Sequence, residues 1–353
     1  MGANLHIAFP VASRSSFGYW FSYFVVFSRA ILALFWFGIT AYAGASAMST
    51  MLIAIWPSFA DIPNQVPASA GITTGTMTAY LLYSILQAPL LLIPTERLQY
   101  MFVAKAILVP PMVLAMVIWT CLKAKTGGSE LFSQPATVSG SAKAWVWLST
   151  MTSVTGGWAT LPVNISDFSR FSKTPGAQWW QLLIIPTIKI ITALCGLACT
   201  GASKYIYGEY VWNPLTIVAS WCDTPGGRFA AFVASAIWLL AQLSCNISAN
   251  AVSFSNDITT LAPKWFNLRR GSIFAMIFGG WALVPWKILA SATTFLSFMS
   301  GYSIFMAPFA GILCCDYWIV KKRHIDVPAL FDPHGRYRYN RVSLPLYMWQ
   351  SES

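Results

Sequence analysis

Polar side chains crowd into one apolar stretch of the chain, "AQLSCNISANAVSFSND", residues 241–257. Asn246 and Asn250 are four residues apart, so in a helix they share one face. Polar groups are costly inside a membrane helix and usually face the protein interior or a solute pathway. Serines alone would fit hydrogen bonding between helices. Two carboxamides among the serines favour a binding site for a polar solute instead.

A second group of suitable side chains lies in "ALFWFGITAYAG", residues 33–44. Trp36 and Thr40 are also four residues apart and share a helical face. The indole ring offers a flat surface for stacking, and the hydroxyl offers a hydrogen bond nearby. This pair predicts a place for a planar heterocycle, although the same spacing is common in ordinary packed helices.

The stretch "GGWATLPVNISDFSRFSK", residues 156–173, interrupts an apolar run that is long enough to cross a bilayer. Glycine costs about 1 kcal/mol and proline about 3 kcal/mol in a helix interior, so the glycine pair and Pro162 break the helix. Broken membrane helices persist where they face protein or a polar cavity, and transporters use them at binding sites. We therefore expect Gly157 and Trp158 to line a solute site, with an interfacial anchor as the alternative role for Trp158.

Few charged side chains lie in or beside the apolar runs. Arg29 and Lys189 fall inside them, and Asp167 and Asp257 fall near their ends. Arg29 and Lys189, inside the runs, are functional by default, although Arg29 could also extend its guanidinium to the membrane surface. The chain lacks paired Asp-rich metal motifs and any nucleophile placed beside a base. It is therefore not expected to be an enzyme.

The composition identifies the elements that must position these residues. The chain is 56% hydrophobic and 9% charged, and its mean hydropathy is +0.59. Soluble domains carry about a quarter charged residues, so this chain is expected to be an integral membrane protein. The net charge of +11 does not indicate nucleic-acid binding, because the basic residues form no stripe with stacking aromatics. The seven cysteines and three histidines show no zinc or disulfide spacing, and neither a metal nor a cofactor is expected.

We expect an all-α, polytopic helical bundle with about eight membrane spans of roughly 20 apolar residues each. They are 28–52, 77–94, 101–122, 144–163, 179–200, 229–252, 273–291 and 294–320. With the N-terminal segment in the cytosol, 14 of the 22 Lys and Arg residues fall on the cytosolic side, six on the other side and two inside spans. Because basic residues favour the cytosolic side, this distribution predicts that both termini are cytosolic.

Four segments together resemble a known permease family. They are "HIAFPVASRSSFGYWFSYFVVFSRAILALFWFGI", "GGWATLPVNISDFSRFSK", "AQLSCNISANAVSFSNDITTLAPKWFNLRRG" and "FMAPFAGILCCDYWIVKKRHIDVPALFDPHGRYRY". The chain is similar, over about residues 2–340, to the nucleobase:cation symporter-1 family in its fungal uracil, allantoin, uridine and thiamine branch. The resemblance implies a twelve-span protein with five-plus-five inverted repeats, of which this chain would hold spans three to ten. On this interpretation residues 1–340 form a single, incomplete transporter domain, and residues 341–353 form a divergent C-terminal tail.

The resemblance also assigns roles to individual residues of the solute site. Trp36 and Trp158 match two rings that stack on the solute, and Asn250 matches an asparagine that hydrogen-bonds it. Thr40 stands where the family usually has a glutamine for the amide edge of the ring, which shortens the reach of that side chain. Asn246 is expected to line the same site.

Three further residues match the family's cation site. Ala241 would contribute a carbonyl and Ser244 a hydroxyl, whereas Cys245 stands where a threonine hydroxyl would ligate sodium. A thiol is a poor ligand for a hard cation. The coupling ion is therefore expected to be a proton in preference to sodium.

The sequence thus predicts a secondary active transporter that imports a planar nitrogenous solute across the bilayer by alternating access. Uracil, allantoin, uridine and thiamine all remain open as solutes, and the plasma membrane is the location that the family implies. No nucleic-acid partner is expected. The alternative is a transport-inactive membrane fragment or interaction partner, because a chain that lacks two helices beside the site would leave that site open.

Overall fold

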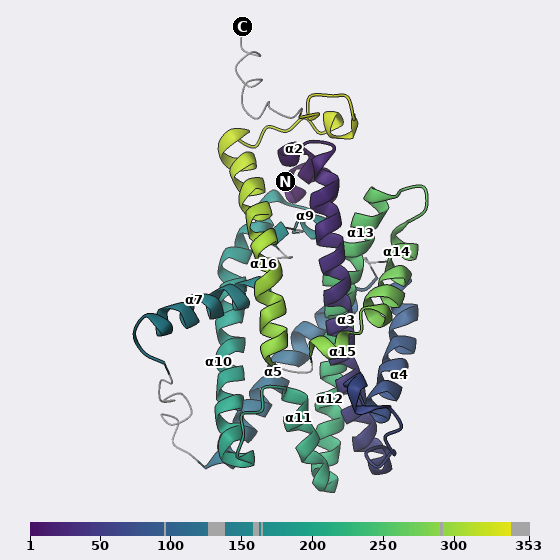
Figure 1. Cartoon of the computed structure of the whole chain (residues 1–353), viewed down its shortest axis with the longest axis vertical. Coiled ribbons are helices and arrows are strands. Elements are labelled where there is room, and N and C mark those ends of the chain that lie inside the picture. The colour runs from purple at the N-terminus through teal and green to yellow at the C-terminus, as the bar shows by residue number, and fades with distance from the viewer. Residues whose placement is uncertain (95–96, 126–137, 158–161, 164, 290–291, 340–353) are drawn as a thin grey trace.

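The computed structural model describes most of the chain. The described residues are 1–94, 97–125, 138–157, 162–163, 165–289 and 292–339. Every regular element within these ranges is helical (Figure 1). The all-α membrane bundle expected from the sequence is therefore confirmed.

The longest helix, α3 (Phe21–Ile55), lies at the centre of the bundle. It packs against α4 (Thr74–Leu91) and along a composite helix. That composite helix consists of α12 (Pro225–Cys245), a π-helical turn at Asn246–Ala251 and α13 (Val252–Leu261). The 18-residue window of α3 that best fits a membrane span is 61% buried, so this helix is the core of the protein rather than its lipid face.

Small residues allow α3 to approach its neighbours closely. A methyl group added at Gly38 would lie 2.3 Å from the carbonyl oxygen of Gly279. One added at Gly44 would lie 2.2 Å from the ring of Tyr83. Glycines at helix contacts are a common way to pack membrane helices, because they let the backbones meet.

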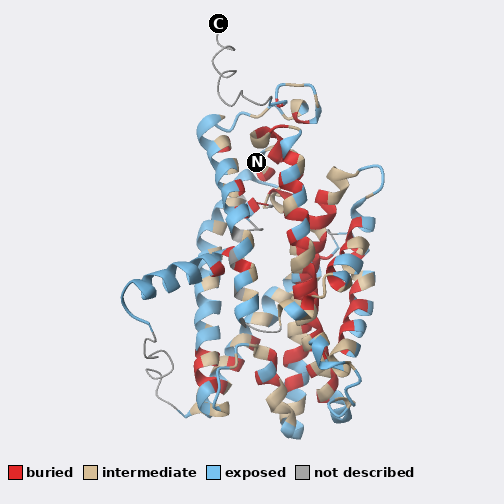
Figure 2. Ribbon diagram, viewed as in Figure 1, coloured by how far each residue is buried: buried red, intermediate tan, exposed pale blue. Residues whose placement is uncertain are grey.

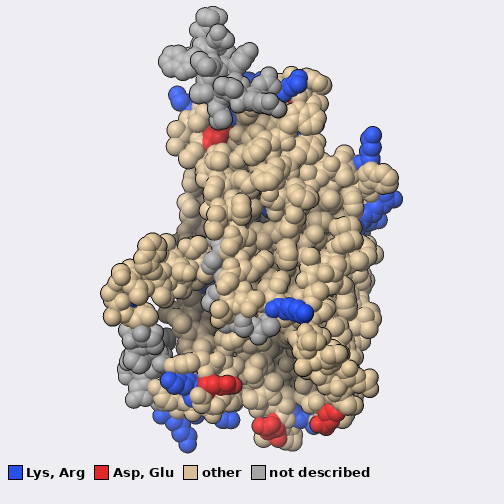
Figure 3. Space-filling model, viewed as in Figure 1, with Lys and Arg blue, Asp and Glu red and all other residues tan. Residues whose placement is uncertain are grey.

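The outer helices are apolar but largely exposed within the chain. They are α5 (Gln99–Ala124), α10 (Gln181–Tyr207) and α16 (Ala292–Cys315). In the 18-residue stretch that best fits a membrane span, only 11% of the residues are buried in α5 and in α10, against 61% in α3. Figure 2 shows this difference between the outer helices and α3. Charged side chains gather mainly at the two ends of the molecule (Figure 3). This distribution fits a bundle whose apolar belt faces lipid.

Five described helices are long and apolar enough to cross a membrane. The other three expected spans differ from simple long helices. The second is the 18-residue α4. The fourth is α7 (Gly140–Gly156), which has 17 residues and runs across the long axis of the bundle in Figure 1. The seventh is divided into α14 (Leu268–Phe274), a π-helical turn at Ala275–Ala282 and α15 (Pro285–Ile288).

The backbone conformation near Val284 accounts for the division of the seventh expected span. Val284 has a positive φ of 50°, which a β-branched residue rarely adopts. Pro285 begins the next helical turn and has no amide hydrogen to continue the preceding one. The helical run therefore ends at this point, where a continuous span was expected.

Short elements complete the described chain. They are α1 (Gly2–Leu5), α2 (Phe9–Phe17), α9 (Ser166–Ser169) and α11 (Pro214–Ala219), with 3₁₀ turns at Pro57–Phe59, Ala68–Ala70, Pro175–Trp180, Ser220–Asp223 and Pro328–Phe331, and a π-helical turn at Asp316–Val320 after α16.

The two ends of the described chain meet at one end of the bundle. The amide of Tyr19 donates to the carbonyl oxygen of Tyr337 at 2.9 Å. The hydroxyl of Tyr339 donates to the backbone carbonyl oxygen of Ser15 at 2.6 Å. At the opposite end, Arg228 donates to two carbonyl oxygens in the last turn of α3, each at 3.0 Å. This arrangement is the one expected for an even number of membrane crossings.

Candidate functional site

Asn250 lies in the π-helical turn between α12 and α13, where the composite helix crosses α3. Its Nδ2 lies 3.2 Å from the carbonyl oxygen of Trp36, 3.2 Å from Thr40 Oγ1 and 2.9 Å from Asn246 Oδ1. π-helical turns often occur at functional sites, because the extra residue redirects side chains. The structure thus brings both asparagines and both residues of the Trp36 pair into one cluster, as the spacing predicted.

The asparagines differ in what they leave available. Asn246 is fully buried, and its Nδ2 donates to the carbonyl oxygen of Phe37 at 3.1 Å. Its Oδ1 accepts from Asn250. Asn250 is 7% exposed, and among the described residues no donor bonds its Oδ1. Asn246 therefore positions Asn250, and Asn250 carries the acceptor that remains open.

The ring of Trp36 is half-buried against aromatic residues of α16. Its Nε1 donates to the hydroxyl of Tyr302 at 3.1 Å. Phe295 and Phe298 approach the ring edge-on, with centroids at 5.9 and 6.3 Å. These contacts fix the plane of the indole, which a stacking platform requires.

Tyr302 was not identified from the sequence. Its hydroxyl accepts from Trp36 and also donates to the carbonyl oxygen of Gly156, at the end of α7. A single tyrosine in the long apolar run of α16 was the available signal, because a membrane-buried hydroxyl needs a partner. Tyr302 thus connects the platform on α3 to the interrupted helix.

The interrupted helix is confirmed at its first half. α7 ends at Gly156, and Gly157 follows it directly. A methyl group added at Gly157 would lie 2.7 Å from Met299 Cε. The predicted second ring, Trp158, lies outside the described residues. Its placement beside Trp36 stays a prediction.

The predicted cation residues lie on α12, one turn before the asparagines. Ala241 is half-buried, Ser244 is buried and Cys245 is exposed on the described chain. The hydroxyl of Ser244 donates its hydrogen to the carbonyl oxygen of Leu240 at 2.7 Å. The lone pairs of Oγ are not used in this hydrogen bond. No cluster of three or more His, Cys, Asp or Glu suited to a metal ion occurs among the described residues.

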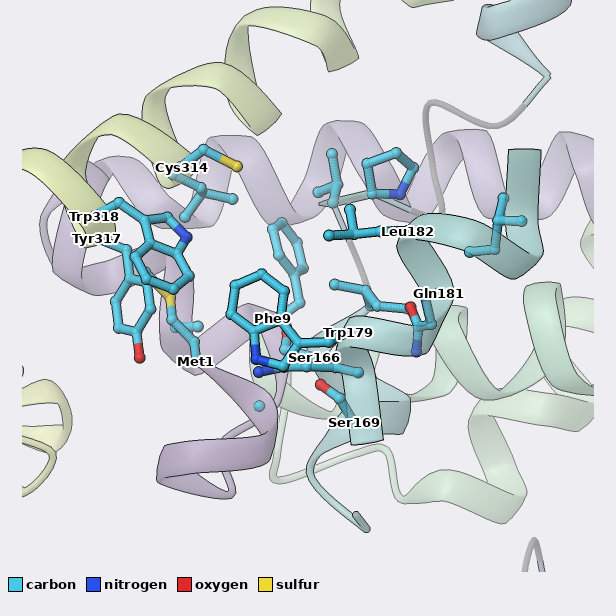
Figure 4. A pocket seen from close by; sticks show the side chains of 18 of the residues that line it. Met1, Phe9, Ser166, Ser169, Trp179, Gln181, Leu182, Cys314, Tyr317 and Trp318 are labelled. Atoms are coloured by element: carbon cyan, nitrogen blue, oxygen red, sulfur yellow. The ribbon is translucent and has the colours of Figure 1, made fainter. Parts of the chain in front are cut away.

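A cavity of about 560 Å³ lies elsewhere, toward the end of the bundle that carries the termini (Figure 4). Phe9, Ser166, Leu182, Lys189 and Tyr317 are among the residues that line it. Its lining includes none of the residues of the Asn250 cluster. The convergence of polar and aromatic groups, rather than this cavity, identifies the candidate solute site.

Comparison with known proteins decides the family. Residues 1–344 match the model of permeases for cytosine/purines, uracil, thiamine and allantoin. The chain belongs to this permease family. The resemblance found in the four sequence segments is thus confirmed over nearly the whole length.

Three similar relatives are permeases of fungi. The chain is 39% identical over 344 residues to a permease of Schizosaccharomyces pombe, covering 97% of this chain and 61% of that protein. It is 34% identical to the uracil permease and 32% identical to the allantoin permease of Saccharomyces cerevisiae, covering 94% of this chain and 53% of each. The chain therefore spans between half and two thirds of the length of these relatives. Their names are those of transporters rather than enzymes, as expected for this chain.

Solved structures support the fold. The chain resembles Mhp1, a nucleobase-cation-symport-1 family transporter in a closed conformation with bromovinylhydantoin bound. The TM-score is 0.72 at 23% identity, over 96% of this chain and 70% of that one. The inward-facing conformation of Mhp1 gives 0.68 over the same shares. The chain thus shares the helical arrangement of this transporter.

Proposed function

We propose that this permease imports a planar nitrogenous solute, such as uracil, allantoin or uridine, by cation-coupled alternating access. Family membership and the names of the fungal relatives support a nucleobase-like solute. The observation that carries the proposal is the Asn250 cluster beside the fixed ring of Trp36.

The chemistry of this cluster selects a class of solute. The amide hydrogens of Asn250 are directed to Trp36, Thr40 and Asn246, so its Oδ1 is the group that receives a donor. Uracil and allantoin present ring N–H groups beside carbonyls, which supply such a donor in the plane of the ring. Stacking of a base on an aromatic side chain contributes about 1–3 kcal/mol. One in-plane hydrogen bond and one stacking face, with Trp158 as the proposed second face, define the site.

We infer that the coupling ion is a proton in preference to sodium. Ala241 and Ser244 supply oxygen atoms, but Cys245 supplies sulfur in the position that the family fills with a hydroxyl. Sodium prefers oxygen ligands, so this substitution weakens that site. We also propose that both termini lie in the cytosol, because the described termini share one end of the bundle and the expected spans put most basic residues on that side. The proposed location in the plasma membrane rests on the family alone.

The test measures binding and uptake with the same protein. The purified chain is reconstituted into liposomes, and uptake of labelled uracil and allantoin is followed under a proton gradient and then under a sodium gradient. We expect solute accumulation with the proton gradient alone. Asn250→Ala is expected to weaken solute binding by about tenfold, the loss of one hydrogen bond of about 1–1.5 kcal/mol.

Ser248→Ala is the matched control for that variant. Ser248 lies in the same π-helical turn, and its hydroxyl donates to the Ser244 carbonyl oxygen of its own helix at 2.8 Å. Its binding affinity should equal that of the unmodified chain. Uptake that Asn250→Ala leaves unchanged contradicts the proposed site, and a chain that accumulates neither solute contradicts the proposed function.

A further inference from the structure

Each of the chain segments that form the solute site also carries a charged residue a short distance away in the sequence. Arg29 lies seven residues before Trp36 on α3, and Asp257 lies seven residues after Asn250 on the composite helix. Asp167 lies on α9, just beyond the interrupted segment. Seven residues correspond to about 10 Å along a helix. The three charged groups therefore form a second layer, about two turns from the solute site.

These three side chains meet in a fully buried cluster. Arg29 Nη1 lies 3.2 Å from Asp167 Oδ2, and Nη2 donates to Asp257 Oδ1. Nη2 also lies 3.1 Å from the carbonyl oxygen of Ser253. Asp167 Oδ1 accepts the amide hydrogen of Phe9 at 2.8 Å. All three charged side chains are at most 1% exposed, so Arg29 does not extend to the membrane surface as the sequence allowed.

The carboxylates in this cluster outnumber the cations. The second oxygen of Asp257, Oδ2, is buried and has no hydrogen-bond partner among the described residues. A second cation, Arg170, lies near the cluster: its Nη2 lies 3.4 Å from Asn256 Oδ1, and its charge acts on Asp167. Arg269 and Arg270, on the neighbouring α14, are exposed. Two buried carboxylates that share one guanidinium favour uptake of a proton, because burial penalises the uncompensated charge.

One side chain, that of Phe9, contacts both the large cavity and this charged cluster. Phe9 and Ser166 line the cavity (Figure 4). The guanidinium carbon of Arg29 lies over the Phe9 ring, 4.5 Å from its centroid. The phenyl ring thus separates the buried charges from a space that opens near the chain termini. Burial also raises the pKa of Asp167, which follows the membrane segment, although Arg29, the Phe9 amide and the charge of Arg170 lower it.

We propose that the Asp167–Asp257 pair holds the proton that couples solute import, and that Phe9 controls its exchange with the cavity. This proposal rests on the proposed function, since it supplies the ion site of that transport cycle. The proton adds to a carboxylate oxygen and later leaves to water in the cavity, so no covalent bond to carbon changes. Because Asp257 and Asn250 share one helix, a shift of that helix would link protonation to solute binding.

Infrared spectroscopy of the purified chain in lipid nanodiscs tests the site without any solute. Near neutral pH we expect a carbonyl band from a buried, protonated carboxylic acid. The band should be lost in Asp257→Asn, which keeps the shape of the side chain and an acceptor for Arg29, and kept in Asp257→Glu. Asp61→Asn, in the exposed loop after α3, is the matched control and should retain the band. Absence of the band from the unmodified chain, or its persistence in both Asp257→Asn and Asp167→Asn, would overturn the proposal.

Two further measurements separate the ion site from the solute site. In liposomes, Asp257→Asn should exchange internal for external solute but lose accumulation against a gradient. Loss of exchange and accumulation together, in a variant that remains monodisperse, contradicts a role in coupling. Phe9→Ala should make the carboxylic acid exchange with deuterated water at least several-fold faster, and an unchanged rate contradicts the role of Phe9. If the unmodified chain exchanges no candidate solute, the proposed function fails, while the infrared result still decides whether the pair holds a proton.

Discussion

Replacement of Tyr302 by phenylalanine tests whether α16 fixes the stacking platform. The substitution removes only the hydroxyl, which accepts from Trp36 Nε1 at 3.1 Å and donates to the carbonyl oxygen of Gly156. The phenyl ring and its edge-on contact with the indole remain. The variant therefore isolates the hydrogen bonds from the packing.

The expected magnitude follows from those two bonds. A hydrogen bond contributes about 0.5–1.5 kcal/mol net, and a buried donor without a partner costs about 1–3 kcal/mol. Trp36 and Tyr302 are only half-buried, so the lower part of each range applies. We expect the free energy of solute binding to weaken by about 1–2 kcal/mol, which is about 5- to 30-fold in Kd.

Equilibrium binding of labelled uracil or allantoin to the purified chain is the assay. The control is Tyr205→Phe, at an exposed position on α10. It also removes a tyrosine hydroxyl, but one outside the stacking platform, and should leave Kd unchanged. Tyr302→Phe with the Kd of the unmodified chain would refute the argument that α16 orients the ring. Equal weakening in both tyrosine variants would also refute it.

Three other substitutions test the packing and the polar cluster. Thr40→Val keeps the shape of the side chain but removes the Oγ1 that lies 3.2 Å from Asn250 Nδ2, so solute binding should weaken by about 2- to 10-fold. An unchanged Kd would exclude Thr40 from the cluster. Gly38→Ala places a methyl group 2.3 Å from the backbone oxygen of Gly279, and size-exclusion chromatography should show loss of folded protein. A monodisperse Gly38→Ala variant of normal thermal stability would contradict the close approach of these helices. Arg228→Ala removes two hydrogen bonds to the end of α3, so its melting temperature in detergent should fall by a few degrees; an unchanged value would show that this cap is dispensable.

The sequence predicted the parts of the site that depend on spacing along one helix. The pairs Trp36–Thr40 and Asn246–Asn250 share helical faces, and their polar character in apolar segments indicated an interior position. The structure places all four together. The existence of the break after Gly156 was likewise readable, because glycine and proline act locally on the helix.

Contacts between distant segments could not be predicted in this way. The sequence marked Arg29, Asp167 and Asp257 separately, but their meeting depends on how α3, α9 and α13 pack. Tyr302 was missed for the same reason, since its partners lie 266 and 146 residues away in the chain. The division of the seventh expected span was also missed, because mean hydropathy does not register the positive φ at Val284.

The central claim is that Asn250 Oδ1 accepts a hydrogen bond from a ring N–H of the solute. The most direct measurement compares the binding of uracil with that of uracil methylated at each ring nitrogen, in the unmodified chain and in Asn250→Ala. The account predicts that one methylation weakens binding to the unmodified chain by about tenfold, the value of one hydrogen bond of about 1–1.5 kcal/mol, and has no such effect in Asn250→Ala. Equal losses on methylation in both proteins would contradict it.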